Sequence, residues 1–268
     1  MGATPILEFD FVREKYGPEL LVDVGPVGGL KNFVLDPTPH RLSFYEITFI
    51  AGGRGTFALD EQAYPLQPGR VFFTSPGQVR VWRSEGVSGT TLFFPGEFVE
   101  AFFADSLFLH KIQFFHTSRP PTLVLDEYEK MWFDNALGEM KREIEAVAAG
   151  RSGDAEHALR AMLYLTFVRL NRAYSAAHGT EPDTEVRPVV AQFRRRVEAR
   201  FREERGVAEY ARALGLSPRR LAEVVRPVLG VAPGEYIRQR VYLEARRLVV
   251  FSALNIAEIA YAVGFEDP

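Results

Sequence analysis

The chain has 268 residues, no cysteine and a formal net charge of −3, and 47% of its residues are hydrophobic. Without cysteine there is no disulfide framework and no thiolate metal site, which fits a reducing compartment. The N-terminus lacks the basic start and apolar run of a signal peptide, and no stretch approaches the roughly 20 apolar residues of a membrane helix. These absences together predict a cytoplasmic protein. The length predicts two globular domains.

Charge is unevenly distributed along the chain. Residues 186–268 contain 15 arginines, no lysine and 10 acidic residues, a net charge of +5. The remaining residues contain 17 basic and 25 acidic side chains, a net charge of −8. An acidic part joined to an arginine-rich part is expected of a sensor attached to a DNA-binding module, although a solvated helical face would give the same local excess.

Residues 1 to about 98 alternate short apolar or aromatic runs with turn signals. The runs are FYEITFI, TFAL, AYPL, RVFFT and VRVW, and the turns between them are AGGRG, DEQ, QPG and SPGQ. Close spacing of short strands with Gly and Pro between them is typical of an antiparallel barrel or sandwich. Helices are expected from about residue 99 to 175, so the fold class is α+β with two domains.

Two strands of this barrel carry candidates for an effector site. Tyr45, Ile47 and Phe49 alternate onto one face of a strand, as do Arg80 and Trp82 on another. If both faces point inward, they form an aromatic cage with one guanidinium, which suits a small molecule with an acidic or planar polar group. The same aromatic residues would also serve simply to fill the core.

Two long helices are predicted after the barrel. In the first, residues 126–150, Asp126 and Glu129 have the spacing of a capping box, and the apolar stripe is Met131, Trp132, Leu137, Met140 and Ile144. The second, residues 154–174, has a broad apolar face that fits packing on the barrel and on a second subunit. The residues proposed to mediate this dimerisation are Leu159, Leu163, Phe167 and Leu170.

The segment 176–187 is small and polar and is the predicted linker to a helical domain at 188–268. This domain contains an internal repeat, because Val207–Leu216 and Ile256–Phe265 are identical at five of ten positions. Each copy is a short helix of small residues that ends at a glycine, which supplies the left-handed conformation of a turn. The repeat therefore predicts two helix-turn-helix units.

In the first unit, Ser217 caps the second helix and Pro218 opens it, while Leu221, Val224 and Val225 face inward. The N-terminal part of such a helix enters the DNA major groove. The predicted DNA contacts on it are Ser217, Pro218, Arg219, Arg220, Ala222, Glu223 and Arg226. Proline inside a helix removes an amide donor, so Pro227 predicts a kink or an early end.

Between the two copies, residues 232–252 predict one helix of about 28 Å, a spacer comparable to the ~34 Å between successive major grooves on one DNA face. Its predicted buried positions are Tyr236, Ile237, Val241, Leu243, Ala245, Leu248 and Val249. Its predicted phosphate contacts are Arg238, Arg240 and Arg246, with Arg247 beside them.

The segments LGLSPRRL, GVAPGEYIRQRVYLEARRLV and IAEIAYAVGFEDP make residues 186–268 resemble the DNA-binding domain of AraC/XylS-type transcription regulators. Val225 and Pro227 depart from that pattern. The Leu-x-Pro-Gly and Ser-Pro-Gly-Gln turns of the N-terminal part resemble the cupin-like effector-binding domain of the same family. The resemblance implies an effector-responsive homodimer that binds promoter DNA and contacts RNA polymerase. It also places a second recognition helix after Pro268, so the chain is expected to be incomplete.

An enzyme is the alternative for a cupin-like barrel. Of the five histidines, none lies in residues 42–94 or in a His-x-His pair, and Arg80 stands where a metal ligand would be sought. Phosphate loops and nucleophile elbows are also missing from the sequence. We therefore expect no catalysis, no metal and no cofactor. The remaining alternatives are a small-molecule-binding or enzymatic cupin whose helical tail mediates assembly, and a regulator controlled by a partner instead of a ligand.

Overall fold

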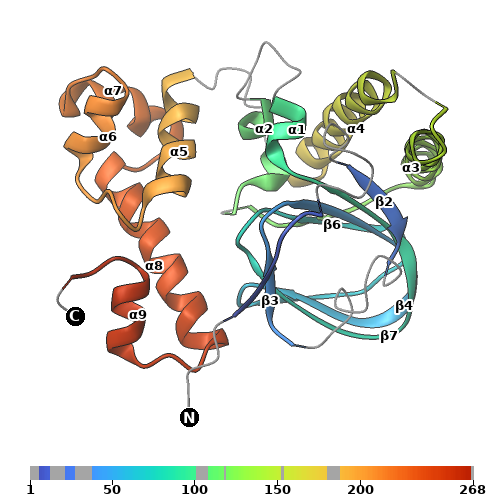
Figure 1. Ribbon diagram of the computed structural model, residues 1–268, viewed down its shortest axis with the longest axis horizontal. Coiled ribbons are helices and arrows are strands. Elements are labelled where there is room, and N and C mark those ends of the chain that lie inside the picture. Colours follow the sequence, from blue (N-terminus) through green and yellow to red (C-terminus); the bar gives the residue numbers. More distant parts are fainter. Residues whose placement is uncertain are drawn as a thin grey trace. The chain divides into compact units, whose positions relative to one another are not determined.

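The chain folds into two compact units, Leu7–Asp183 and Thr184–Pro268 together with Met1–Ile6. The computed structural model describes residues 6–12, 22–27, 38–100, 108–117, 119–151, 154–179 and 188–266 (Figure 1). Within these residues, none of the helices combines the length and the apolar character that crossing a bilayer requires.

The first unit is built on an eight-stranded sheet. Its strands are β1 (Leu7–Phe9), β2 (Asp23–Pro26), β3 (His40–Leu42), β4 (Tyr45–Leu59), β5 (Gln62–Pro65), β6 (Arg70–Thr74), β7 (Val79–Phe94) and β8 (Thr122–Val124). Their order is β1-β3-β7-β4-β6-β8, with β2 also paired to β7 and β5 to β4. All pairs are antiparallel except β1 with β3. Figure 1 shows the sheet curled into a barrel.

The prediction of separate short strands around the AGGRG segment was wrong. β4 continues through it and pairs with β7 along its whole length, with register shifts near Gly52. Gly53 and Gly55 have φ of +100° and +129°, and a side chain at Gly55 would lie 2.1 Å from the Arg83 carbonyl oxygen. The glycines therefore act as β-bulge positions that bend a continuous ribbon, and they do not end a strand.

The barrel also includes a strand outside the predicted 1–98 region. β8 pairs antiparallel with β6, with Leu123 opposite Val71. Before it come α1 (Gly96–Glu100), α2 (Phe108–Lys111) and the 3-10 turn η2 (Gln113–Phe115). The predicted helix around residues 95–108 is only partly tested, because residues 101–107 lie outside the described residues.

Two long helices follow, α3 (Glu127–Ala148) and α4 (Ala155–His178), and both lie along the outside of the barrel (Figure 1). The capping box at Asp126 and Glu129 is confirmed, with the Asp126 side chain accepting from the Glu129 amide at 2.7 Å. Residues 176–178, predicted as linker, belong to α4, and residues 180–187 lie outside the described residues.

The residues predicted to mediate dimerisation are buried inside this unit. Leu159, Leu163 and Phe167 are 0% exposed, and Leu170 is 2% exposed. They pack in one apolar cluster with α3 and with the outer face of the sheet. The dimerisation assignment was therefore wrong, because the broad apolar face of α4 is used within one chain. Met131 was also predicted as buried, but it is 60% exposed.

The second unit is helical, with α5 (Pro188–Arg200), α6 (Val207–Ala213), α7 (Pro218–Leu229), α8 (Pro233–Phe251) and α9 (Ile256–Ala262). α5, α6, α7 and α8 share a core that includes Phe193, Tyr210, Leu221 and Ile237. The spacer helix α8 is continuous, as predicted, but Val249 on it is 56% exposed instead of buried. α7 runs through Pro227 without ending and closes at Gly230, which has φ of +73°.

Candidate functional site: a helix-turn-helix face and a polar barrel interior

The two helix-turn-helix turns have the same backbone geometry. In the first, the Leu216 amide donates to the Ala211 carbonyl at 2.8 Å, and Gly215 has φ of +67°. In the second, the Phe265 amide donates to the Ala260 carbonyl at 2.8 Å, and Gly264 has φ of +88°. The sequence repeat is thus a structural repeat up to residue 266, and the first unit contains a complete second helix, α7.

The start of α7 is built as predicted. The Ser217 hydroxyl accepts from the Arg220 amide at 3.2 Å, and Pro218 occupies the first turn. Leu221 and Val225 are fully buried and Val224 nearly so. Because one side of the helix is fixed in the core, its opposite side is presented to solvent in a fixed orientation.

The solvent side of α7 carries three arginines and one glutamate. The side chain of Arg219 is 91% exposed and that of Arg220 is 62% exposed. Arg226 is also exposed, whereas Ala222 is half-buried. This face has the charge and the exposure that contact with phosphates and base edges requires.

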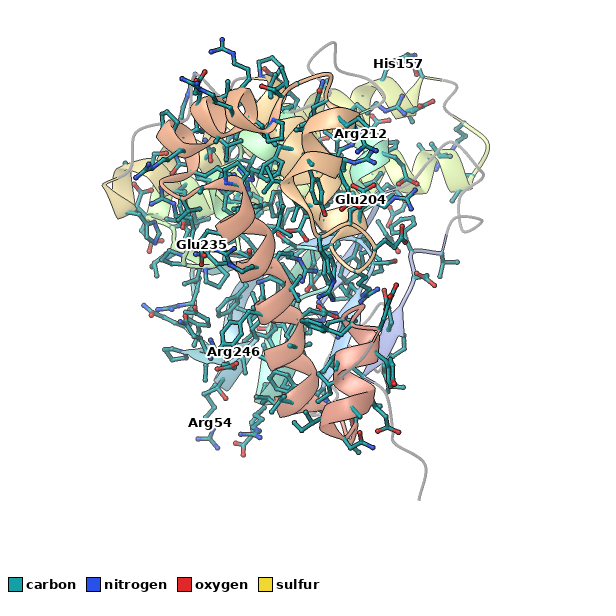
Figure 2. All side chains as sticks on the ribbon, turned by 90° about the vertical axis from the view of Figure 1, so that its left-hand side faces the viewer. Arg54, His157, Glu204, Arg212, Glu235 and Arg246 are labelled. Atoms are coloured by element: carbon teal, nitrogen blue, oxygen red, sulfur yellow. The ribbon has the colours of Figure 1, made fainter. Side chains whose placement is uncertain are left out.

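The arginines of α8 differ in their surroundings. Arg238 is exposed and pairs with Glu235 at the start of the helix, while Arg246 is exposed and lies 5.5 Å from the Tyr242 ring centroid (Figure 2). Arg247, by contrast, is 2% exposed. Arg238 and Arg246 therefore remain candidates for phosphate contacts on this helix, and Arg247 does not.

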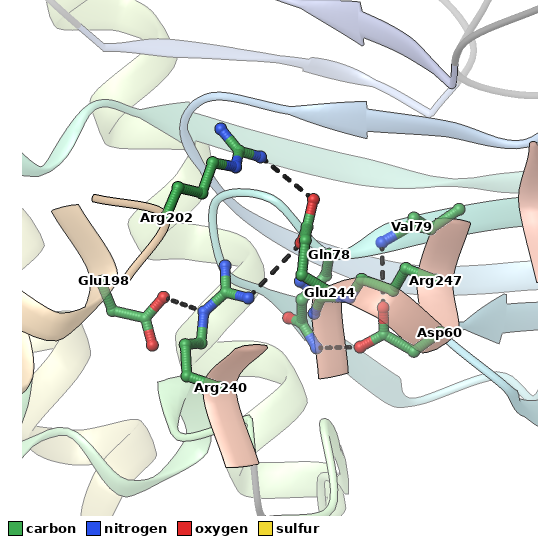
Figure 3. Close-up of polar contacts among 8 residues, drawn as sticks. All are labelled: Asp60, Gln78, Val79, Glu198, Arg202, Arg240, Glu244 and Arg247. Atoms are coloured by element: carbon green, nitrogen blue, oxygen red, sulfur yellow. Dashed lines mark hydrogen bonds and ion pairs between the residues drawn. The ribbon is translucent and has the colours of Figure 1, made fainter. Parts of the chain in front are cut away.

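Arg240 has an internal role (Figure 3). Its Nε donates to Glu198 at 2.6 Å, its Nη1 lies 3.4 Å from Glu244, and its guanidinium lies 4.0 Å from the Phe201 ring centroid. Glu244 itself is 1% exposed and also accepts from Arg202 at 3.1 Å. We therefore leave Arg240 out of the DNA-facing set, because its charge ties α8 to α5 and to the turn after it.

The predicted effector cage is divided between the two faces of the sheet. Tyr45 and Phe49 face outward, with ring contacts to Phe115 of η2 and Phe133 of α3, and Ile47 belongs to the same cluster. The remaining two residues, Arg80 and Trp82, face the barrel interior. Trp82 contacts Phe57, with 4.4 Å between ring centroids, and both are 0% exposed. The single-cage prediction was wrong, because the helices cover the face on which the aromatic triplet lies.

The interior face carries a buried ion pair and a histidine. Arg80 of β7 pairs with Glu46 of β4, and its Nε donates to His40 Nε2 at 3.0 Å. His40 Nδ1 lies 2.9 Å from the Thr38 carbonyl, so this nitrogen donates and the imidazole is neutral. Burial lowers the pKa of Arg80 to about 9, which leaves the guanidinium charged at neutral pH. Sequence reasoning missed Glu46, which sits in the middle of an apolar strand.

Several polar atoms on this interior face have no hydrogen-bond partner among the described residues. They are Arg80 Nη2, Glu46 Oε1, Trp82 Nε1 and Thr74 Oγ1. Each of these four side chains is at most 1% exposed. Buried polar groups in folded proteins are nearly always satisfied, so a cluster of such atoms indicates a place where water or a ligand belongs.

Comparison with known proteins agrees with this architecture. Residues 33–165 match the AraC-like ligand binding domain, and residues 210–268 match a helix-turn-helix domain. The HTH-type transcriptional activator RhaS of Pectobacterium atrosepticum is 27% identical over 233 residues, which cover 85% of this chain and 79% of that protein. The HTH-type transcriptional regulator YfiF of Bacillus subtilis is 21% identical over 228 residues, covering 84% and 71%.

Among solved structures, unsaturated fatty acid bound wild-type ToxT from Vibrio cholerae is 14% identical, with coverage of 92% of this chain and 87% of that one and a TM-score of 0.42. The two family matches and the curated relatives indicate a transcription regulator and not an enzyme. With a ligand-binding barrel followed by a helix-turn-helix unit, the chain belongs to the AraC family of effector-responsive, DNA-binding transcription regulators.

Proposed function

We propose that this regulator reads promoter DNA with the exposed face of α7 and responds to a small molecule bound inside the barrel. The observation that supports the DNA-binding face is the exposure of Arg219, Arg220 and Arg226 on a helix whose other side is buried. Arg238 and Arg246 on α8 add phosphate contacts. We also propose that the protein acts in the cytoplasm and that RNA polymerase is its partner. Transcription in vitro with purified polymerase tests the proposed partner.

Replacing Arg226 with alanine should weaken binding to duplex DNA of any sequence, because a phosphate contact carries no base information. The plot of log affinity against log salt should become shallower by about 1. Fluorescence anisotropy with a labelled duplex across a salt series measures both quantities.

The matched control is Arg142→Ala on α3, an exposed arginine of the other unit that pairs with Glu139. It removes the same charge and should leave the salt slope unchanged. If both variants show the same slope of log affinity against log salt, Arg226 does not contact the phosphates.

We propose that the effector is a polar molecule without an acidic group. The Arg80 charge is already paired with Glu46, so an anion would have to compete with that carboxylate. Asp23 lies on the same interior face, because both it and Glu46 are opposite Phe93. A ligand with several hydroxyl or amide groups would instead satisfy the unpartnered atoms of Arg80, Glu46 and Trp82. The sequence left open an acidic or a planar polar group on the ligand, and the pairing of Arg80 with Glu46 supports a group without negative charge.

We also propose a homodimer formed through the outer faces of α3 and α4. Tyr128, Met131 and Leu165 are 64%, 60% and 53% exposed on these helices. Leu165→Glu should shift the dimer towards monomer in sedimentation equilibrium, because a carboxylate would be buried in the contact. Val124→Glu changes a similarly exposed apolar residue on β8 and should leave the association constant unchanged. A monomeric wild-type chain at micromolar concentration would contradict the proposal.

A further inference from the structure

The DNA-facing side of α7 contains one carboxylate among its arginines. Glu223 accepts from Arg219 Nε at 3.3 Å through Oε1 and from Arg220 Nη1 at 3.1 Å through Oε2. Its side chain is 46% exposed, and both arginines are more exposed still. Pairs of this kind contribute little to stability, so the arrangement is not explained by a structural role.

A carboxylate at this position opposes contact with the DNA backbone. The affinity of a protein for arbitrary DNA comes almost entirely from cations that neutralise phosphates, and an acid on the same face is repelled by them. Glu223 also occupies both arginines, which would otherwise reach phosphates independently. On DNA of arbitrary sequence, Glu223 therefore lowers the affinity twice, through its own charge and through Arg219 and Arg220.

In the major groove, the amino groups of cytosine and adenine can donate to a carboxylate, and cytosine N4 is the better partner because adenine N7 is a neighbouring acceptor. Arginine in turn finds its best partner in guanine, which offers two acceptors. Where the sequence supplies these groups, the ion pairs of Glu223 with Arg219 and Arg220 can be exchanged for base contacts. Where it does not, opening the pairs leaves the carboxylate uncompensated beside the phosphates.

We propose that Glu223 is a specificity-determining residue, which suppresses binding to arbitrary sequences and accepts from a cytosine amino group in the correct site. This inference rests on the proposed DNA-binding face of α7. It assigns a different role to Glu223 than to Arg226, because removal of Glu223 strengthens binding to arbitrary DNA. Discrimination between favourable and unfavourable sites in part by repulsion is a general route to specificity.

The chain offers a matched control on the same unit. Glu203 is an exposed glutamate in the segment after α5, and it pairs with Arg200 three positions earlier, as Glu223 pairs with Arg220 three positions earlier. Glu223→Gln and Glu203→Gln raise the net charge by the same amount. A difference between them therefore reports the position of the carboxylate and not the total charge.

The experiment compares the full chain with the two variants on a pool of random-sequence duplexes and on duplexes selected from that pool by the wild type. Glu223→Gln should bind the random pool about tenfold more tightly, with a steeper salt dependence. It should also lose a cytosine preference at one position of the selected sites, which costs about tenfold or more in discrimination. Glu203→Gln should change both by less than about twofold.

Equal gains for the two glutamine variants on random DNA would overturn the proposal, since net charge alone would then explain them. Unchanged sequence preference in Glu223→Gln would also overturn it. Failure of the wild type to bind any duplex at low salt is a different outcome, because it would contradict the proposed function of α7 itself.

Discussion

Replacing Arg80 with methionine should lower the free energy of unfolding by about 3–5 kcal/mol. The change leaves the Glu46 carboxylate, which is 1% exposed, without its cation inside the barrel. An uncompensated buried charge is far more costly than the loss of an exposed ion pair. Urea unfolding followed by tryptophan fluorescence measures the change, since Trp82 lies on the same interior face.

The ribbon of β4 and β7 supplies the control for this experiment. Arg54 and Glu85 form an ion pair between the same two strands, but their side chains are 84% and 73% exposed. Arg54→Met should therefore cost less than about 1 kcal/mol. The double variant Glu46→Gln/Arg80→Met should regain part of the stability that Arg80→Met loses. Equal losses for Arg80→Met and Arg54→Met would mean that the buried pair does not hold the barrel.

The proposed effector site lies on the same interior face, so the ligand class can be tested there. A polyhydroxylated ligand without charge should raise the melting temperature of the wild type, because binding to the native state alone stabilises it. Carboxylic acids of equal size should not, since they would meet Glu46 and Asp23. Stabilisation by acids only would contradict the proposed ligand class and would favour the acidic group among the two that the sequence left open.

Replacing Gly264 with alanine should destabilise the helical unit by about 3–4 kcal/mol. The residue has φ of +88°, and a methyl group there would lie 1.9 Å from the Arg202 carbonyl oxygen. The second turn is therefore packed directly on the segment after α5, where Arg205 also donates to the Val263 carbonyl. Thermal unfolding followed by circular dichroism at 222 nm measures the loss of helix.

Gly215→Ala is the matched substitution in the first turn. Gly215 has a similar φ of +67°, but nothing lies within 4 Å of an added methyl group. Its cost should be only that of the left-handed conformation, about 1 kcal/mol. The difference between the two alanine variants isolates the close approach at Gly264. Equal costs would mean that the turn moves away from Arg202 without penalty.

The repeated turn was predictable because its determinants are local. Small residues, a capping serine or asparagine, and a left-handed glycine occur within about ten positions of each other, and they fix the backbone largely by themselves. Ser217 caps α7 as predicted, and Asn255 caps α9, which is the counterpart of α6 with its cap position at Gly206. The helical spacing of Leu221, Val224 and Val225 also predicted their burial in the core correctly.

The barrel interior was less predictable, because it depends on which face of a strand is covered by distant helices. Tyr45, Ile47 and Phe49 look like a lining, but α3 and α4 bury that face from outside. The bulge near Gly52 then changes the register, so that alternation before it does not carry over to the residues after it. Glu46, the partner of Arg80, could be recognised only once β4 and β7 were paired.

The buried position of Glu244 has a consequence for measurements on DNA. Mobile ions screen charges that are exposed to solvent far more than charges inside a protein. The attraction of Arg240 and Arg202 to Glu244 should therefore persist in concentrated electrolyte, and the spacer would stay anchored to the segment after α5. A decline in complex formation as electrolyte is added can thus be attributed to displacement of the regulator from phosphates, and not to loosening of its own framework.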